Sequence, residues 1–376
     1  MTVQLDRRSL LAAGLGLAAA AASGPAGARA PSPGYDAALD AAFAERSPIA
    51  LGGAVVTADG VAWSGVRGVR RFGEPDPVGL EDKWHLGSNA KAMTAAVYGR
   101  LVDQGRARWD AFVPEIFTDI PVDPAWADIR IVDLMHHRAG LGDASVLSRD
   151  WLMSARRDPA SLVDQRTALA ARAFAAPPTG TPGTFAYGNA DYVMIGAAIE
   201  RLTRASWEAA MATELFAPLG LASAGFGAPR QNASGGPNAW GHMAPQPPFT
   251  PMDPASPGAD NPLAMSPAGG VHMTLSDYGR FLQALIRDGE GWLKPETVRA
   301  LATPPAEGEP YAGGWGVRRD EAGDSVLGHD GSNTLWHVTA SLNLGTGVGL
   351  IGAANQSPQN GAPRTLVQGL RTASAV

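Results

Sequence analysis

The chain has 376 residues, 45% of them apolar, so it can bury a sizeable core as one large domain or two small ones. Its 30 basic and 36 acidic residues leave a formal charge of −6 without long runs of one sign, which argues against nucleic acid and anionic membrane surfaces as partners. The absence of cysteine excludes disulfides, thiolate metal sites and a cysteine nucleophile.

The N-terminal residues have the pattern of a cleaved export signal. Asp6-Arg7-Arg8-Ser9 precedes an apolar run, Leu10 to Ala22, that is too short to span a bilayer. Small residues between Ala26 and Ala30 offer cleavage sites, and the paired arginines indicate the twin-arginine route. We therefore expect residues 1–30 to be a signal peptide and residues 31–376 to form an exported, periplasmic or secreted domain with no membrane span. A frayed cytosolic helix is the alternative.

Strand-like stretches lie at both ends of the remaining chain. Gly53–Ala58 and Val61–Gly68 flank Asp59-Gly60, a strong hairpin signal. Four further strands are predicted near the C-terminus: Gly314–Arg319, Ser325–His329, Val338–Leu344 and Val348–Ala353.

Between these ends the chain is mostly helical in pattern. Apolar residues recur at helical spacing in Ala90–Leu101, Asp191–Leu202 and Asp277–Ile286, the last with Ser276 as its expected N-cap. Strands at both ends with helices between them predict an α+β fold, in which an antiparallel sheet built from both chain ends is flanked by helices.

One segment, Pro229 to Pro267, carries ten prolines in thirty-nine residues. This composition predicts a long irregular excursion. Long loops are often functional, so we expect it to form a wall or lid over an active site.

The first candidate for chemistry is Ser88-Asn89-Ala90-Lys91, at the start of a predicted helix. A spacing of three places Ser88 and Lys91 on one helical face, where a lysine among apolar side chains loses its charge readily and can activate the serine. The first backbone amides of the helix can also face an oxyanion. A surface lysine one turn from an N-capping serine is the alternative.

A second candidate is the turn that holds Tyr187 and Asn189, just before the helix predicted near Asp191. Tyr187 can carry a proton to a leaving group, and Asn189 can bind a substrate amide or hold Lys91. Taken alone, a core tyrosine and a helix cap are the more common roles of these residue types.

A third candidate, Gly328-His329-Asp330-Gly331-Ser332, follows a predicted strand. His329 could polarise Tyr187 or meet a substrate carboxylate, Gly331 permits close backbone approach, and the amide of Ser332 could complete an oxyanion hole with that of Ser88. A structural histidine is the alternative.

In this order the three pieces resemble the serine β-lactamase and penicillin-binding superfamily, in its branch of class C β-lactamases, D-alanyl-D-alanine carboxypeptidases and family VIII esterases. Ile129–Leu141, Leu215–Leu221 and Pro267–Val271 match it too. The resemblance implies a β-lactamase/transpeptidase-like fold with a mostly helical subdomain inserted at about residues 105–265.

The resemblance also implies roles for the candidate residues. Ser88 would be the nucleophile, Lys91 a base or the residue that orients the base, and Tyr187 a general base and acid. Asn189 and His329 would contact substrate. The His-Asp-Gly sequence at 329–331 departs from the Lys-Thr-Gly of most β-lactamases, so a permanent positive charge for a β-lactam carboxylate is missing.

We therefore expect a serine hydrolase that acts through an acyl-enzyme on a peptide, amide or ester. A carboxylesterase of small acyl esters and a non-catalytic binding or sensing protein are the alternatives. A small-molecule or peptide substrate is expected, without metal or organic cofactor, and the sequence predicts no oligomeric state. His136-His137 has no acidic partner at ligand spacing and is expected to be a capped or surface pair.

Overall fold

Strands from the two ends of the chain lie side by side in one antiparallel sheet. The computed structural model describes residues 33–244, 247–320 and 323–374, so the predicted signal peptide lies outside the described residues. The described strands are Ala50–Thr57 (β1), Gly60–Gly68 (β2), Trp84–His85 (β3), Gly225–Phe226 (β4), Gly241–Met243 (β5), Thr250–Met252 (β6), Val271–Met273 (β7), Gly316–Arg319 (β8), Ser325–Ser332 (β9), His337–Asn343 (β10) and Val348–Ala354 (β11).

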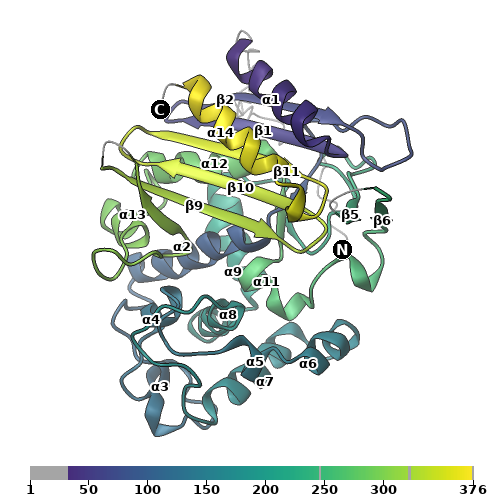
Figure 1. Cartoon of the computed structure of the whole chain (residues 1–376). Coiled ribbons are helices and arrows are strands. Elements are labelled where there is room, and N and C mark those ends of the chain that lie inside the picture. Colours follow the sequence, from purple (N-terminus) through teal and green to yellow (C-terminus); the bar gives the residue numbers. More distant parts are fainter. Residues whose placement is uncertain (1–32, 245–246, 321–322, 375–376) are drawn as a thin grey trace, which may run out of the picture. The chain divides into compact units, whose positions relative to one another are not determined.

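The main sheet has the order β2-β1-β11-β10-β9-β8 among the described strands (Figure 1). The C-terminal strand β11 pairs with β1 from Leu51↔Ala354 to Val56↔Gly349, while β2 pairs with the other edge of β1. The predicted sheet from both chain ends is therefore confirmed, and so is the hairpin. Its turn is formed by Ala58 and Asp59, one residue earlier than predicted, because Thr57 pairs with Gly60.

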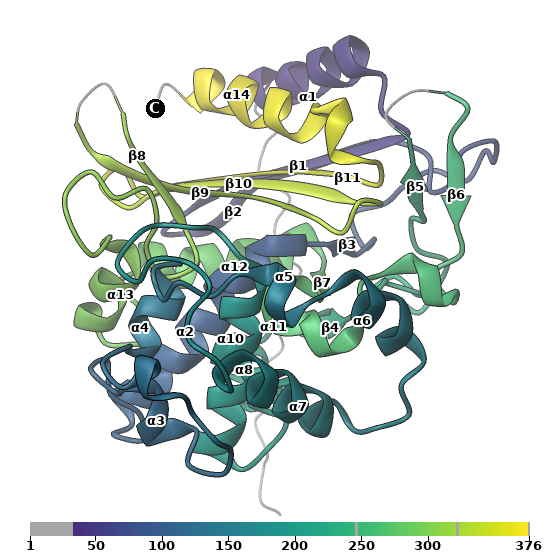
Figure 2. The same cartoon turned by 60° about the horizontal axis from the view of Figure 1, so that its bottom comes forward.

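Helices cover both faces of this sheet. The described α-helices are Pro33–Arg46 (α1), Ala90–Asp103 (α2), Val113–Ile116 (α3), Ile131–Met135 (α4), Asp143–Val146 (α5), Arg149–Ser154 (α6), Leu162–Phe174 (α7), Asn189–Thr203 (α8), Trp207–Met211 (α9), Ala217–Leu219 (α10), Ser266–Gly269 (α11), Leu275–Ile286 (α12), Pro295–Ala302 (α13) and Ala362–Ser374 (α14). α1 and α14 lie together on one face, and α12, α2 and α8 lie on the other (Figure 2).

Two apolar cores follow from these layers. The outer one packs Leu39 of α1 and Leu366 of α14 against Trp63 of the sheet. The larger inner one joins the other face of the sheet to α2, α8 and α12. β1 is buried along almost its whole length because both of its faces are covered, which explains its nearly continuous apolar sequence.

The helix α2 is buried on nearly all sides, from Ala90 to Gly99 and at Leu101. Its first turns contain mainly alanine, methionine and valine, and a helix that is apolar all round is stable only inside a protein. This burial holds the start of α2, which follows Ser88, firmly between the sheet and α8.

The helix α12 begins two residues earlier than the sequence predicts. Thr274 is its N-cap, and the Thr274 side chain accepts a hydrogen bond from the backbone N–H of Asp277. The prediction of Ser276 as the cap was wrong, because the apolar face of the helix begins at the buried Leu275, two residues before the predicted start.

The segment from Pro229 to Pro267 contains short elements as well as irregular chain. β5 and β6 pair with each other, and α11 begins at Ser266. The prediction of an excursion without elements is corrected to this extent.

No helix in the described ranges combines the length and the apolar composition that crossing a bilayer requires.

Candidate active site

Ser88 lies in a tight backbone turn between strand β3 and helix α2. The turn is the 3-10 segment Gly87–Asn89. Gly87 has a φ of +51°, and a Cβ atom at this position would lie 2.1 Å from the backbone N of Ser332, so only glycine fits here. The residues Gly87 and Ser88 therefore pack backbone to backbone against the end of β9.

Lys91 meets Ser88 as the spacing predicts. Its Nζ lies 3.1 Å from Ser88 Oγ, 2.8 Å from Asn189 Oδ1 and 2.8 Å from the carbonyl oxygen of Ala268. The side chain is 0% exposed. Burial lowers the pKa of Lys91 to about 7, against the opposing influence of Asp143 and Asp191. The amine is therefore poised to exchange a proton near neutral pH.

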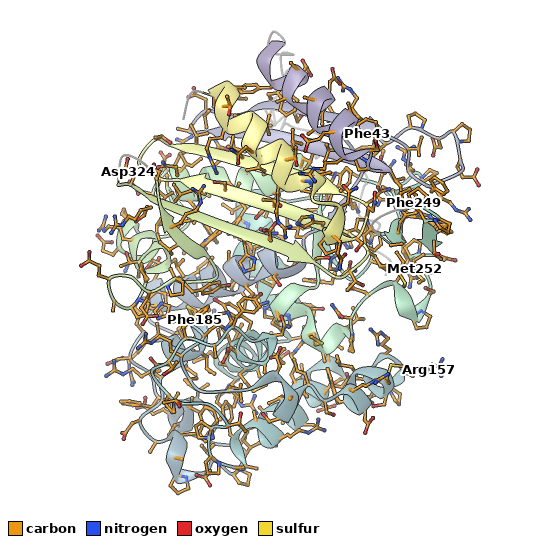
Figure 3. The ribbon with its side chains drawn as sticks, viewed as in Figure 1. Phe43, Arg157, Phe185, Phe249, Met252 and Asp324 are labelled. Carbon is orange, nitrogen blue, oxygen red and sulfur yellow. The ribbon has the colours of Figure 1, made fainter. Side chains whose placement is uncertain are left out.

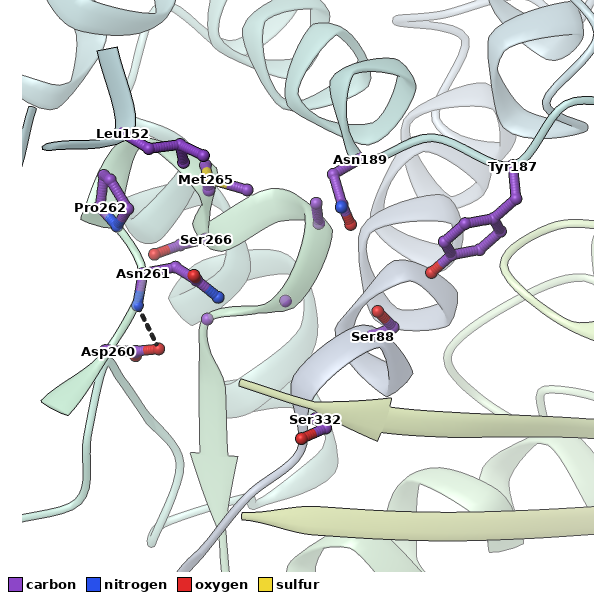
Figure 4. Close-up of a pocket in the computed structure, with 13 residues that line it drawn as sticks. Ser88, Leu152, Tyr187, Asn189, Asp260, Asn261, Pro262, Met265, Ser266 and Ser332 are labelled. Atoms are coloured by element: carbon purple, nitrogen blue, oxygen red, sulfur yellow. Dashed lines mark hydrogen bonds between the residues drawn. The ribbon is translucent and has the colours of Figure 1, made fainter. Parts of the chain in front are cut away.

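Tyr187 points its hydroxyl toward Ser88 across the pocket mouth (Figure 4). The side chain is 45% exposed, and Lys91 Nζ lies 4.9 Å from its ring centroid. Loss of solvent around the phenol raises the pKa of Tyr187 to about 12, although its contact with Ser88 lowers it. The phenol therefore carries its proton at neutral pH.

Asn189 starts helix α8 but does not cap it. Gly188 is the N-cap, without a side-chain hydrogen bond, and the amide of Asn189 bridges Lys91 and Asp143. Its Oδ1 accepts from Lys91, and its Nδ2 donates to Asp143 Oδ2 at 3.3 Å. These contacts fit the role of Asn189 in holding Lys91.

The end of β9 supplies the residues Gly331 and Ser332. A Cβ atom on Gly331 would lie 2.0 Å from the carbonyl oxygen of Leu86 and 2.8 Å from the backbone N of Ser88. Ser332 lines the same pocket as Ser88. The end of β9 therefore packs directly against the turn that carries Ser88, and Ser88 and Ser332 line one pocket.

Both ring nitrogens of His329 are engaged by groups other than Tyr187. Its Nδ1 lies 2.9 Å from the carbonyl oxygen of Asp330, and its Nε2 lies 2.9 Å from Tyr311 Oη. The Nδ1–H donates to that carbonyl, so Nε2 accepts the proton of the Tyr311 hydroxyl. Burial and the nearby Lys91 lower the pKa of His329 to about 4. His329 is absent from the residues that line the pocket at Ser88, although its ring lies 6.0 Å from that of Tyr187.

The pocket beside Ser88 has a volume of about 270 Å³. One wall comes from the proline-rich segment, as the sequence predicts, through Asp260, Asn261, Pro262, Met265 and Ser266 (Figure 4). Leu152 of α6 closes the far end. Neither lysine nor arginine occurs among the described residues that line this pocket, and Asp260 is the charged residue among them.

Several polar residues at the site carry no sequence signal that separates them from ordinary surface residues. Asp143 accepts hydrogen bonds from the Asn189 side chain and from the backbone N–H of Ala190, at 2.7 Å. Tyr311 packs against Tyr187 and Phe185, which lies on the segment leading to α8 (Figure 3). Each comes from a separate stretch of chain, so only the folded structure identifies it.

The pair His136-His137 is buried, which corrects the expectation of a capped or surface pair. His137 Nδ1 lies 2.7 Å from Asp191 Oδ2, and both side chains are almost fully enclosed. Burial raises the pKa of Asp191 well above its usual range and lowers that of His137 to about 2. The two form a buried hydrogen-bonded pair behind Tyr187, whose ring lies 4.6 Å from that of His137.

Known proteins resemble this chain in sequence and in fold. The family model described as Beta-lactamase matches residues 39–371. Penicillin-binding protein 4 of Amycolatopsis lactamdurans is 27% identical over 283 residues, which cover 71% of this chain and 70% of that protein. The unguisins hydrolase of Aspergillus campestris (strain IBT 28561) is 25% identical over 288 residues, and this chain spans half the length of that protein.

Among solved structures, the D-amino acid amidase from Ochrobactrum anthropi SV3, complexed with L-phenylalanine amide, superposes with a TM-score of 0.71. The match covers 90% of this chain and 99% of that one at 19% identity, so it shows a shared fold and nothing beyond the fold. The family match, in contrast, extends over most of the sequence, including all three candidate segments. The chain therefore belongs to the beta-lactamase family.

Proposed function

We propose that the protein is a serine hydrolase that forms an acyl-enzyme on Ser88. The observation that carries the proposal is the 3.1 Å contact between Ser88 Oγ and a fully buried Lys91 amine whose pKa is about 7. A lysine of that pKa is neutral in a large fraction of molecules at neutral pH, so it can accept the serine proton.

In the proposed reaction, Lys91 takes the hydroxyl proton as Ser88 Oγ attacks the substrate carbonyl carbon. The oxyanion faces the amides of Ser88 and Ser332. Tyr187, which is protonated at neutral pH, gives its proton to the leaving group as the carbonyl–leaving-group bond breaks, and the Lys91 ammonium returns a proton to the phenol. Water then attacks the acyl-enzyme, and its proton passes back to Ser88.

The absence of arginine and lysine from the described pocket lining favours one substrate class. A carboxylate placed beside Asp260 would meet like charge and no cation. We therefore propose that amides or esters without a free carboxylate near the reacting carbonyl are better substrates than β-lactams or D-alanyl-D-alanine peptides. This substrate preference favours amidase or carboxylesterase activity over carboxypeptidase activity.

The test is a substrate panel with wild type and Ser88→Ala. The panel contains a D-amino acid amide, a p-nitrophenyl ester, a D-Ala-D-Ala peptide and a chromogenic cephalosporin, and intact mass reports adducts. We expect turnover of amide or ester and a loss of at least about 1,000-fold in kcat/KM in Ser88→Ala. Equal behaviour of the two proteins on all four compounds would refute the assignment. Absence of both turnover and adduct in wild type would favour a binding or sensing protein.

We also propose that the protein is exported by the twin-arginine route, because of the sequence Asp6 to Leu11 and the apolar run after it. Replacing Arg7 and Arg8 together by lysine should retain the precursor inside the cell. Fractionation with mass determination of the mature N-terminus measures this, and unchanged export of the variant would exclude the route.

A further inference from the structure

Behind the nucleophile turn, a fully buried histidine joins the pocket wall to the backbone that carries Ser88. His85 lies on β3 and is 0% exposed. Its Nε2 lies 2.8 Å from Asp260 Oδ2, and its Nδ1 lies 3.2 Å from the backbone N of Gly87. Both ring nitrogens are therefore engaged, one by the wall and one by the turn.

The hydrogen-bond partners determine the tautomer of His85. A backbone N–H can only donate, so Nδ1 must accept from Gly87 and carries no proton. Nε2 then carries the proton and donates it to Asp260. The carboxylate also accepts from Asn333 Nδ2 at 3.0 Å and from the backbone N–H of Asn261 at 2.7 Å. Burial alone would raise the pKa of Asp260, but its contacts with His85 and Asn333 lower it, which keeps it an acceptor.

We propose that His85 is a positioning residue that holds the Gly87 turn, and with it Ser88, in a fixed relation to the Asp260 wall of the pocket. The inference rests on the proposed function of Ser88. Gly87 is buried in a left-handed conformation against Gly331 and Ser332, so a shift of its N–H displaces the nucleophile and its amide together. At the other end of the ring, His85 holds Asp260 Oδ2 in the pocket wall, while Asn333 and the Asn261 backbone hold its Oδ1.

Two substitutions separate the two ends of this link. In His85→Asn, the amide oxygen occupies the position of Nδ1 and can still accept from Gly87, whereas the contact with Asp260 is lost. In His85→Gln, the amide nitrogen reaches the position of Nε2 and can still donate to Asp260, whereas Gly87 loses its acceptor. His85→Gln therefore disturbs the Gly87 turn, and His85→Asn disturbs the Asp260 wall.

We expect His85→Gln to lower kcat by about 10- to 100-fold with KM nearly unchanged, because a small displacement of a nucleophile has effects of this size. His85→Asn should keep kcat within about 3-fold and raise KM by about 3- to 10-fold as the wall loosens. His272→Gln is the matched control. His272 is a buried histidine opposite His85 in the β3–β7 pair, and its Nδ1 contacts the carbonyl of Gly227 and not Gly87, so its kcat and KM should match those of wild type.

Rates are normalised to folded protein by thermal unfolding and by the burst of the acyl-enzyme. Equal losses of kcat in both His85 variants would overturn the inference. So would a loss of kcat in His85→Asn together with a rise in KM alone in His85→Gln. If either variant does not fold, Asp260→Asn replaces it. We expect this variant to have a higher KM and an unchanged kcat. A fall in kcat without a change in KM would contradict the link. Should Ser88→Ala retain activity, the proposed function fails; should only the His85 pattern fail, the function stands without this link.

Discussion

The amine of Lys91 is surrounded by oxygen acceptors from three separate segments and by two aromatic rings. Ser88, Asn189 and Ala268 provide the oxygens, and Tyr187 and Tyr192 provide the rings. No salt bridge to Lys91 exists among the described residues, so desolvation prevails over the nearby carboxylates and lowers its pKa. In the proposed reaction this residue makes the rate depend on pH, and its lowered pKa also contributes to the pH dependence of stability.

The first prediction concerns the pH dependence of acylation. In the proposed reaction the neutral amine is the base, so kcat/KM should rise as pH increases through about 7, the pKa of Lys91, and then level off. Lys91→Arg should abolish acylation, since guanidinium cannot give up its proton at these pH values. Stopped-flow rates between pH 5 and pH 9 measure the profile. A rate that is independent of pH across 7 would contradict the role of Lys91.

The second prediction concerns stability. The pKa of Lys91 is lowered in the folded state from its ordinary value of 10.5 to about 7, so the unfolded chain binds more protons between these values. The free energy of unfolding of wild type should therefore rise with pH from about 7 to about 10.5 relative to that of Lys91→Met, by at most about 1.4 kcal/mol per pH unit. Urea unfolding of both proteins measures the difference. Parallel curves would show that Lys91 is charged in the folded protein.

At the level of single elements, helix ends place the functional groups. The 3-10 turn before α2 carries Ser88, the start of α8 carries Asn189, and α11 provides the Ala268 carbonyl that holds Lys91. Helix ends suit this purpose because their terminal backbone groups lack partners within the helix and are available to neighbouring groups.

The third prediction tests the corrected start of α12. Thr274→Ala removes a side chain that accepts from Asp277 N–H and lies 3.1 Å from Ser223 Oγ, so it should cost about 1 to 2 kcal/mol in the free energy of unfolding. Ser276→Ala, at an exposed position in the first turn, is the matched control and should change stability by less than about 0.5 kcal/mol. Thermal unfolding compares them, and a larger loss in Ser276→Ala would restore the sequence-based cap.

For the molecule as a whole, the central feature is that β1 depends on a strand about 300 residues away. β11 lies between β1 and β10, and α14 covers the outer core together with α1. The sheet is incomplete until the last strand is present, so neither half of the chain has a closed core of its own.

The fourth prediction follows from this dependence. Removing residues 345–376 deletes β11 and α14 and should abolish cooperative unfolding, because β1 and β10 lose their shared partner. A chain that begins at residue 31 keeps every described element and serves as the control. We expect it to show the same unfolding transition as the full chain. Circular dichroism and calorimetry distinguish the two. A cooperative transition in the C-terminally shortened chain would contradict this account.

Local patterns in the sequence predict the elements because local sterics and burial produce them. The Asp59-Gly60 hairpin, the apolar face of α8 and the Ser88–Lys91 spacing each span a few residues, so backbone geometry alone brings their groups together. The α+β sheet from both chain ends follows from the order of those elements.

Other features depend on contacts between distant segments, which no short pattern contains. The pairing of His329 with Tyr311, of His137 with Asp191 and of Asp260 with His85 joins residues 18, 54 and 175 positions apart. The burial that lowers the pKa of Lys91 likewise comes from packing between the sheet, α2 and α8. The amino-acid sequence by itself thus determined the elements and the Ser88–Lys91 pair. Tertiary packing decided the pKa shifts and the orientation of the groups around that pair, since desolvation and hydrogen bonding act only once distant segments meet.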